Sequence, residues 1–343
     1  MLSDFIDKTV LVTGSCGTVG AELVRQLVDG PAARIVCIDN NETELFFQLE
    51  QYRHTGKVTV HLADIRDLEA LSLRMRGVDL VLHAAALKHV GLCEDSPNQA
   101  IQTNIHGTQN VIDAALANSV ERVVFTSSDK AVNPTNVMGT SKLMGERLMT
   151  AAAQTSSALT ARENESGTIF ASTRFGNILG SRGSVVPLFQ RQIELGGPIT
   201  LTDTDMTRFV MTLEDAAALV LDSVWLATGG EVMVTKMLIA RIEDLAHVMR
   251  EKLANGRDIE IVEVGAKAGE KMYEELMNDE EVRRTYEHGD FFCVVPAFDD
   301  VKSPRYAYLH DADRAGKPYN SALEPAMSRD ELADYLTSKK VLG

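Results

Sequence analysis

Residues 9–20 read TVLVTGSCGTVG, an apolar and β-branched run that leads into a loop with three glycines, Gly14, Gly17 and Gly20. The run over residues 9–13 has the composition of a buried strand, and residues 21–28 have the apolar spacing of a helix. A strand, a glycine-rich loop and a helix in this order begin a doubly wound sheet. The stretch therefore predicts an α/β protein with a phosphate-binding loop near its N-terminus.

The same alternation of strands and helices continues through the first half of the chain. Further strand-like runs are residues 34–38, 58–62, 80–83, 122–126 and 168–173. Helical segments lie around residues 42–51, 68–74, 97–118 and 141–153. This spacing indicates a mostly parallel sheet with right-handed crossovers. We therefore predict a dinucleotide-binding Rossmann domain over residues 1–179.

The pattern changes beyond Leu179, where glycine and proline separate shorter elements. We predict a smaller C-terminal substrate-binding lobe over residues 180–343, with helices over 213–227 and 242–254 and a strand over 231–235. Some of its strands and helices are expected to return to the first domain. The acidic segment from Asn278 to Asp290 is expected to be solvated and mobile.

The composition excludes several classes of protein. There are 34 Lys and Arg against 49 Asp and Glu, and the net charge of −15 argues against nucleic acid or an anionic membrane as a partner. The four cysteines lack zinc-ligand spacing and indicate a reducing compartment, so no metal is expected. No apolar run approaches the roughly 18 residues that span a membrane, and the first residues lack the core of a signal peptide. We expect a cytoplasmic protein with no membrane partner.

The glycine loop and the next strand predict the cofactor. Gly14, Gly17 and Gly20 allow a tight turn, close approach to a pyrophosphate and close helix packing. Asp39 ends the second strand, where a carboxylate accepts hydrogen bonds from the adenosine ribose and repels a 2′-phosphate, so NAD is favoured over NADP. The alternative for Asp39 is the N-cap of the next helix. Asp64 follows the third strand and either meets the adenine or caps a helix.

A second informative stretch, Ser127-Ser128-Asp129-Lys130, follows the strand predicted over residues 122–126. It places hydroxyls, a carboxyl and an amine just past a strand end, and Lys142 adds a second amine downstream. Beside a dinucleotide loop, these groups suit redox chemistry followed by acid/base catalysis. The alternative for Asp129-Lys130 is a surface ion pair.

Together these segments resemble the extended short-chain dehydrogenase/reductase family, and more closely its nucleotide-sugar (UDP-N-acetylglucosamine) 4,6-dehydratase branch of bacterial polysaccharide biosynthesis. The matching pieces are residues 13–20, 83–90, 103–104, 107–108, 127–130, 174–177, 180–185, 206–209 and 269–271. The resemblance implies the cofactor NAD, a homo-oligomer, and further cofactor-binding residues. These are Thr13, Thr18, Val19, Ile65, Ala84, Ala85, Ala86 and Lys142.

The resemblance also implies a reaction in three parts. Hydride leaves C4 of the hexose, water is lost across C5 and C6, and hydride returns to C6. Lys142 is expected to hold the nicotinamide ribose, and Ser128 to bond the C4 oxygen. A protonated Asp129 would assist departure of the C6 hydroxyl, and a neutral Lys130 would remove the C5 proton. Side chains of neighbouring strand residues point to opposite faces, so the chain must bend at Asp129.

Met138 departs from the family, whose pattern has a tyrosine at this position. A thioether cannot transfer the C4 hydroxyl proton, so Ser128, Asp129 or a water takes over, or the chain is impaired. A subset of the dehydratases that retain configuration at C5 looks similar in having methionine, and we predict C5 retention on that ground. The alternative is a core methionine.

The substrate residues follow from the same resemblance. They are Lys88, Arg174, Asn177, Ser184, Val185, Arg208, Lys267 and Glu270. A diphosphate needs two or three basic donors. Arg208 could bind a phosphate or, equally well, form an ion pair with Asp203 or Asp205. Lys88 could meet the sugar, and a helix cap or a surface amine is the alternative. Lys267 and Ala268 replace the family's arginine and proline, which weakens the expected grip on the nucleotide.

The predicted function is NAD-dependent 4,6-dehydration of a nucleotide-activated N-acetylhexosamine, with UDP-N-acetylglucosamine as the first choice, by a lyase of glycan biosynthesis. A nucleotide-sugar 4-epimerase is the alternative within enzymes, and Asp129-Lys130 argues against it. A non-catalytic regulator that binds NAD or a nucleotide sugar is the alternative outside enzymes, and Met138 is the feature in its favour.

Overall fold

The computed structural model of the chain describes residues 2–163, 167–265 and 269–342. Its centre is a nine-stranded sheet whose strands, in spatial order, are β14 (Thr285–His288), β15 (Phe291–Val294), β10 (Val232–Thr235), β6 (Ile169–Arg174), β5 (Arg122–Thr126), β4 (Leu80–His83), β1 (Thr9–Thr13), β2 (Arg34–Asp39) and β3 (Val58–Leu62). The sheet is parallel from β3 to β10, and β15 and β14 extend it antiparallel. The doubly wound α/β fold predicted from the sequence is confirmed.

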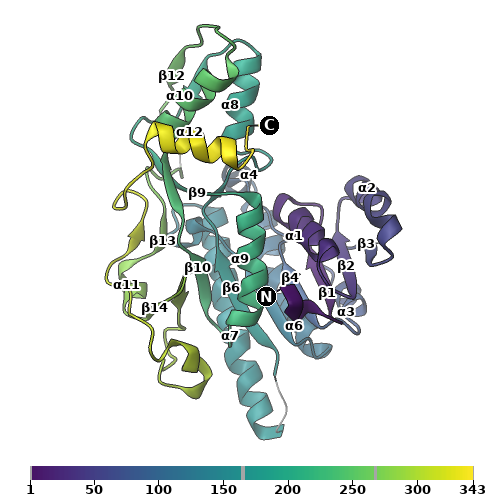
Figure 1. Cartoon of the computed structure of the whole chain (residues 1–343). Coiled ribbons are helices and arrows are strands. Elements are labelled where there is room, and N and C mark those ends of the chain that lie inside the picture. Colours follow the sequence, from purple (N-terminus) through teal and green to yellow (C-terminus); the bar gives the residue numbers. More distant parts are fainter. Residues whose placement is uncertain (1, 164–166, 266–268, 343) are drawn as a thin grey trace.

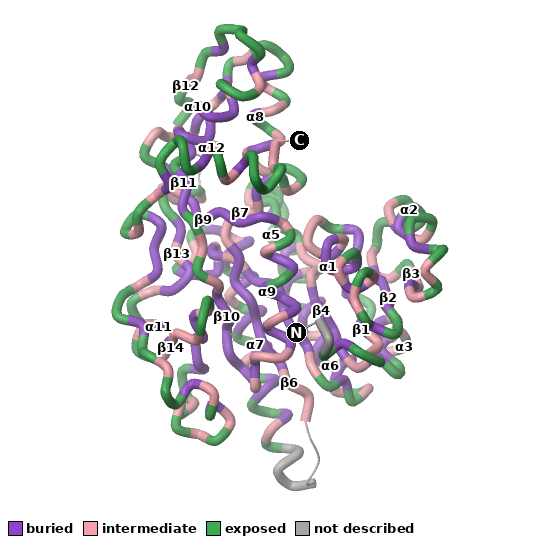
Figure 2. The backbone as a smooth tube through the Cα atoms, viewed as in Figure 1, coloured by how far each residue is buried: buried purple, intermediate pink, exposed green. Residues whose placement is uncertain are grey.

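Helices cover both faces of this sheet. They are α1 (Thr18–Asp29), α2 (Glu42–Tyr52), α3 (Leu68–Arg74), α4 (Val90–Asp95), α5 (Pro97–Ala100), α6 (Gly107–Ala117), α7 (Val137–Glu163) and α9 (Leu213–Leu226). Val10 and Val12 of β1 pack into a core with α1 and α9, whereas Leu11 packs into a core with α3, α6 and α7. The alternation of side chains along one buried strand thus supplies both cores. Figure 2 shows the buried residues concentrated in the central strands.

The helix predicted over residues 97–118 is divided. A π-helical turn, η3 (Ile101–His106), separates α5 from α6. Asn104 in this turn is buried, and its amide bonds both the N–H and the carbonyl of Leu87 as well as the Ser141 hydroxyl. The turn therefore holds the loop after β4 in place.

A cap formed by the second half of the chain stands at the top of Figure 1. It contains α8 (Val185–Glu194), α10 (Ile242–Leu253) and α12 (Arg329–Ser338) with the paired strands β8 (Ile199–Leu201) and β12 (Ile261–Glu263). Phe189, Leu245 and Leu332 belong to its separate core. Two small sheets join the cap to the main sheet: β7 (Asn177–Ile178), β9 (Thr207–Met211) and β11 (Leu238–Arg241) form one, and β13 (Glu275–Met277) and β16 (Tyr319–Asn320) the other.

The expectation that residues 278–290 are mobile is wrong, because the segment forms α11 (Asp279–Val282) and the edge strand β14, which pairs with β15. Asp279, Glu280 and Asp290 are exposed, as expected. Glu281 is the exception, since it is 2% exposed and pairs with the buried Arg174. That ionic partner comes from elsewhere in the chain, so the composition of the segment does not reveal it.

Candidate active site

A cavity of about 330 Å³ lies where β1, β2 and β4 end, at the point where the strand order reverses. The glycine loop forms one of its walls. Gly14 has a φ of +65°, and a Cβ there would lie 2.6 Å from Ala85 Cα. A Cβ on Gly20 would lie 2.1 Å from the Gly14 carbonyl oxygen. The loop therefore requires glycine at both positions, as a phosphate-binding turn does.

Most of the predicted cofactor residues line this cavity. They are Gly14, Gly17, Asp39, Asp64, Ile65, Ala84, Ala85 and Ala86. Thr13, Thr18, Val19, Gly20 and Lys142 lie outside its lining. Thr13 stands behind the wall, where its hydroxyl bonds His83 Nδ1 at 2.7 Å and accepts the Ala85 N–H at 3.3 Å. It shapes the loop after β4 from behind.

Sequence reasoning missed further residues of the lining. These are Cys16, Ile38, Asn40, Asn41, Glu44, Ala63, Leu87 and Thr103. Arg182 also lines the cavity; as a basic residue of the family-like segment 180–185 it was a candidate for the diphosphate and not for the cofactor. Most of the missed residues adjoin a predicted cofactor residue, so proximity in the chain was the available signal. Arg182 and Thr103 come from distant segments, and only the fold brings them to this cavity.

The two helix-cap alternatives are wrong. Asn41 caps α2, since its side chain accepts the Glu44 N–H, and Asp67 caps α3. Asp39 instead accepts the N–H of Cys16 at 3.0 Å and so joins the end of β2 to the glycine loop. Asp64 pairs with Arg66 at 2.6 Å, and this hydrogen bond lowers the pKa of the Asp64 carboxyl.

The acid/base stretch forms a tight turn after β5. The 3₁₀ turn η4 (Asp129–Ala131) begins directly at Asp129 and is capped by Ser128. The chain therefore leaves the strand geometry, and neighbouring side chains meet. Ser128 Oγ donates to Asp129 Oδ1 at 2.7 Å, and Lys130 Nζ donates to the same oxygen at 3.0 Å. Asp129 is fully buried, so the surface ion pair considered above is not what forms.

Glu274 completes this cluster, and sequence reasoning missed it. It precedes β13, and its Oε1 lies 3.3 Å from Lys130 Nζ and 3.9 Å from Arg208 Nε. Its side chain is 2% exposed. Asp129 Oδ2 and Glu274 Oε2 are both buried, and neither has a hydrogen-bond partner among the described residues. Two carboxyls from opposite ends of the chain thus converge on one lysine with unused acceptor oxygens.

The side chains around Lys130 favour its charged form, whereas the predicted base is neutral. Burial acts to lower the pKa of Lys130, but Asp129 and Glu274 outweigh it and raise the pKa above its ordinary value. Burial and the neighbouring Asp129 raise the pKa of Glu274. The cluster therefore holds Lys130 as an ammonium ion, and a proton has to leave Lys130 before it acts as a base.

Lys142 and Met138 lie on α7, beside this turn. Lys142 Nζ donates to the Thr126 carbonyl at 2.8 Å and lies 4.7 Å from the centre of the Phe125 ring. Burial lowers the pKa of Lys142 to about 8. Met138 is buried and packs with Cys93 and Ala100, as the core-methionine alternative requires.

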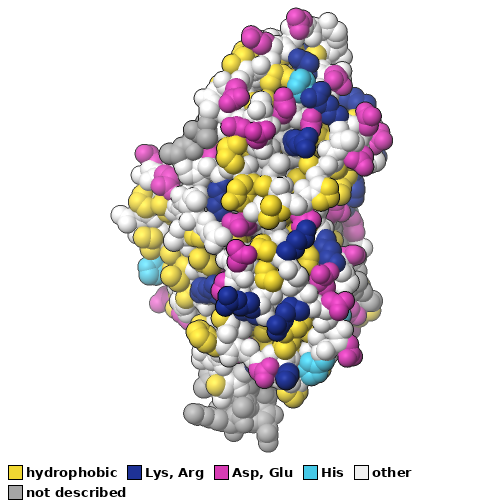
Figure 3. Space-filling model, turned by 90° about the vertical axis from the view of Figure 1, so that its left-hand side faces the viewer, with side chains coloured by type: hydrophobic (Ala, Val, Ile, Leu, Met, Phe, Trp, Pro, Cys, Tyr) yellow, Lys and Arg dark blue, Asp and Glu magenta, His cyan; other side chains and the backbone are white. Residues whose placement is uncertain are grey.

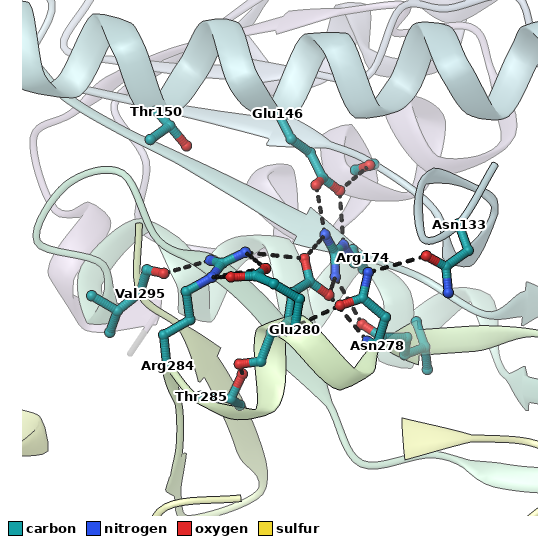
Figure 4. Close-up of polar contacts among 12 residues, drawn as sticks. Asn133, Glu146, Thr150, Arg174, Asn278, Glu280, Arg284, Thr285 and Val295 are labelled. Atoms are coloured by element: carbon teal, nitrogen blue, oxygen red, sulfur yellow. Dashed lines mark hydrogen bonds and ion pairs between the residues drawn. The ribbon is translucent and has the colours of Figure 1, made fainter. Parts of the chain in front are cut away.

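Arg174 is not a substrate ligand, contrary to the prediction. Its guanidinium donates to Glu146 on α7, to Glu281 on α11 and to the Leu276 carbonyl, at distances of 2.7 to 2.9 Å (Figure 4). Its five N–H groups are all used in these bonds, and the residue is 1% exposed. It therefore has no donor left for a diphosphate.

Arg208 uses part of its guanidinium within the protein. Its Nη atoms donate to the carbonyls of Thr207, Lys271 and Met272, so the alternative of an ion pair with Asp203 or Asp205 is wrong. Arg208 lies 3.9 Å from the Glu274 carboxyl, and its bonds to the carbonyls of Lys271 and Met272 hold the segment that precedes Glu274.

Four of the remaining substrate candidates lie in or beside the segment from β7 to the start of α8. Lys88 Nζ donates to the Arg182 carbonyl at 2.9 Å, and burial followed by the Arg182 charge lowers its pKa. Asn177 Oδ1 and Ser184 Oγ are buried without partners, and Val185 begins α8. Glu270 lies elsewhere, 3.5 Å from the Thr202 hydroxyl. Lys267 falls outside the described residues.

Comparison with known proteins identifies the family. Residues 10–296 match the family model described as "Polysaccharide biosynthesis protein". The chain belongs to this family. The uncharacterized membrane protein MJ1061 of Methanocaldococcus jannaschii is 45% identical, over 84% of this chain and 86% of its own length. The UDP-N-acetylglucosamine 4,6-dehydratase (inverting) of Campylobacter jejuni is 36% identical, over 85% and 84%.

A solved structure agrees over nearly the whole chain. The structure of Pen from Bacillus thuringiensis superposes with a TM-score of 0.89 at 38% identity and covers 99% of both chains. Curated relatives of comparable identity also include UDP-glucose 4-epimerases of Rickettsia species. The resemblance to the nucleotide-sugar branch of the extended short-chain dehydrogenases/reductases is thus confirmed. The chain is an enzyme of this type, which modifies nucleotide sugars.

The relative from Methanocaldococcus is described as a membrane protein, so we asked whether any helix of this chain could cross a bilayer. Within the described residues, no helix combines the length and the apolar character needed to cross a bilayer.

Proposed function

We propose that the chain catalyses the NAD-dependent 4,6-dehydration of a nucleotide-activated N-acetylhexosamine, with UDP-N-acetylglucosamine as its substrate. The observation that carries this proposal is the contact of Ser128, Asp129 and Lys130 directly after β5, the strand that pairs with β4, because the residues that follow β4 line the cavity at the glycine loop. Oxidation of an alcohol alone needs no such carboxyl and lysine pair, whereas elimination of water needs both an acid and a base.

The cavity fits a dinucleotide. Gly14 and Gly17 would lie against the pyrophosphate, and Asp39 would face the adenosine ribose. The carboxylate of Asp39 would repel the 2′-phosphate of NADP, which favours NAD. NAD bound there supplies reversible hydride acceptance.

The residues of the turn would divide the remaining work. Ser128 would bond the C4 oxygen, Asp129 would give its proton to the departing C6 hydroxyl, and Lys130 would take the C5 proton. Because the guanidinium of Arg174 is committed and that of Arg208 is partly used, Lys88 and Arg182 are the cations proposed for the diphosphate, with Asn177 and Ser184 as neutral partners.

Mass spectrometry of the product tests this function. Incubation with UDP-N-acetylglucosamine should give a nucleotide sugar lighter by one water, and Lys130→Ala should abolish that loss while NAD stays bound. Retention at C5, the outcome that we propose from Met138, is read from proton NMR coupling constants of the same product. A product of unchanged mass would refute dehydration.

The alternative of a 4-epimerase is favoured by the Rickettsia relatives, which are named UDP-glucose 4-epimerases. It uses the same C4 oxidation and conserves mass, so the same experiment distinguishes it. The buried Asp129 and Lys130 have no task in that reaction, which is why we prefer dehydration.

A further inference from the structure

We propose that Glu274 ends a proton relay, Ser128–Asp129–Lys130–Glu274, that takes up the C4 hydroxyl proton in place of the tyrosine that Met138 replaces. This inference rests on the proposed function and assigns Glu274 a part in its first step. Glu274 acts through Lys130 and not on the sugar itself.

The relay is continuous in the structure. Ser128 Oγ lies 2.7 Å from Asp129 Oδ1, Asp129 Oδ1 lies 3.0 Å from Lys130 Nζ, and Lys130 Nζ lies 3.3 Å from Glu274 Oε1. The first two links are hydrogen bonds and the last is an ion pair, and each joins a group that carries a proton to one that accepts it. Met138 cannot enter such a chain, because a thioether sulfur has no proton to give.

Glu274 is built to accept a proton at the end of this relay. Its Oε2 is buried and unpartnered, so no donor within the described residues holds it in the ionised form from that side. The charged groups that face it are Asp129, Lys130, Arg208 and Lys271. Burial and Asp129 together raise the pKa of Glu274, so the carboxyl takes up a proton more readily than an exposed glutamate does.

The backbone keeps Glu274 in position independently of its charge. Its N–H donates to Ser321 Oγ at 2.9 Å, and its carbonyl accepts the Ser321 N–H at 2.9 Å. The carboxyl is thus carried to Lys130 by the start of the β13–β16 pairing. This position makes it a fixed part of the cluster.

The protons balance over the whole reaction. As the C4 hydride, with its electron pair, goes to the cofactor, the C4 hydroxyl proton passes through Ser128 to Asp129, and Lys130 passes its own proton to Glu274. Lys130 is then neutral and Asp129 protonated. Lys130 Nζ takes the C5 proton, and Asp129 gives its proton to the C6 hydroxyl that leaves as water. The hydride then returns to C6 and one proton returns to C5. The relay takes up two protons and releases two, so the proton stored in the first step makes the water of the second.

Glu274→Gln tests the relay, with Glu275→Gln as a matched control. Glu275 is the next residue, and its carboxylate accepts from Asn133 outside the relay. In a single turnover with UDP-N-acetylglucosamine, Glu274→Gln should slow the transient rise of NADH absorbance by on the order of 10²-fold. A relay that ends at Glu274 works only when this carboxyl is ionised, so the wild-type rate falls as the pH falls through its raised pKa. This acidic limb should vanish in Glu274→Gln and persist in Glu275→Gln; an unchanged limb overturns the proposal.

Infrared spectroscopy tests the same assignment without turnover. Wild-type protein with ¹³C-labelled glutamate should show a carboxylic acid C=O band that titrates above the ordinary range of glutamate, and Glu274→Gln should lack it. Should Glu274→Gln not fold, the wild-type titration still decides, because absence of such a band overturns the relay. Failure of the dehydratase proposal would appear separately, as wild-type protein that releases no water.

Discussion

Two lysines at the active site, the partly buried Lys130 and the buried Lys142, have opposite pKa shifts, and the difference lies in their neighbours. Lys130 lies between the carboxyls of Asp129 and Glu274, which outweigh its burial and raise its pKa. Lys142 meets a backbone carbonyl and an aromatic ring, so burial prevails and lowers its pKa to about 8. Only Lys142 therefore approaches neutrality near physiological pH.

The depressed pKa of Lys142 predicts a pH-dependent stability. Below about pH 8 the folded protein holds a buried ammonium ion, and between pH 8 and the ordinary value of 10.5 the unfolded chain binds more protons than the folded one. The free energy of unfolding contributed by Lys142 should therefore rise over this window, by on the order of 2–3 kcal/mol. Urea unfolding at several pH values measures it.

Lys142→Met should remove this contribution, and Lys252→Met, at an exposed position of α10, is the control. Other groups titrate in the same range, so the quantity to compare is the change in the free energy of unfolding with pH, in the wild type and in Lys142→Met. Equal pH dependence in wild type and Lys142→Met would contradict the assignment.

At the scale of elements, the glycine loop after β1 depends on the absence of side chains. Gly20→Ala would place a Cβ 2.1 Å from the Gly14 carbonyl oxygen, so the loop has to shift. We expect a destabilisation of about 1–3 kcal/mol and protein purified without NAD, as measured by cofactor release and absorbance. Gly91→Ala in α4 is the matched control.

A Cβ on Gly91 meets no atom within 4 Å. That replacement should stabilise α4 by up to about 1 kcal/mol and leave the cofactor content unchanged. If Gly20→Ala retained full cofactor, the loop would not be the site of the pyrophosphate.

The Arg174 cluster joins three elements, namely the end of β6, the helix α7 and the helix α11 (Figure 4). Arg174→Met would leave the carboxylates of Glu146 and Glu281 buried without this partner. Removing one partner of a buried ion pair costs about 3–5 kcal/mol, and we expect that loss in the free energy of unfolding. Chemical denaturation measures it.

The exposed pair of Arg53 and Glu50 is the comparison, because Arg53→Met should cost at most about 1 kcal/mol. Adding Glu146→Gln and Glu281→Gln to Arg174→Met should recover part of the stability, since no unpaired charge then stays buried. Similar losses in Arg174→Met and Arg53→Met would refute this account.

At the scale of the whole molecule, the two halves of the chain share one sheet. β10 of the second half pairs with β6, and α9 packs on α1 through Val220 and Val224. Charges of both signs are interspersed with apolar side chains on the face in Figure 3, so the excess of acid does not gather there into a field of one sign.

Residues 1–179 should consequently fail to fold alone. Without β10 and α9, β6 becomes an open edge and the apolar side of α1 loses its cover, which favours aggregation. Circular dichroism and size-exclusion chromatography of the fragment beside the full chain would show this. A monomeric fragment with a cooperative thermal transition would contradict it.

Three features could be predicted from residues close together in the chain, namely the alternation of strands and helices, the glycine loop and the Asp129-Lys130 turn. The roles of Arg174 and Glu274 became clear only once the chain was folded. In the sequence Arg174 looks like a phosphate ligand, but in the fold it pairs with Glu146 and Glu281. Nothing in the sequence distinguishes Glu274 from the other acidic residues, but the fold places it beside Lys130, just before β13. Burial and ionic partners arise from contacts between distant segments, and no local pattern of residues encodes them.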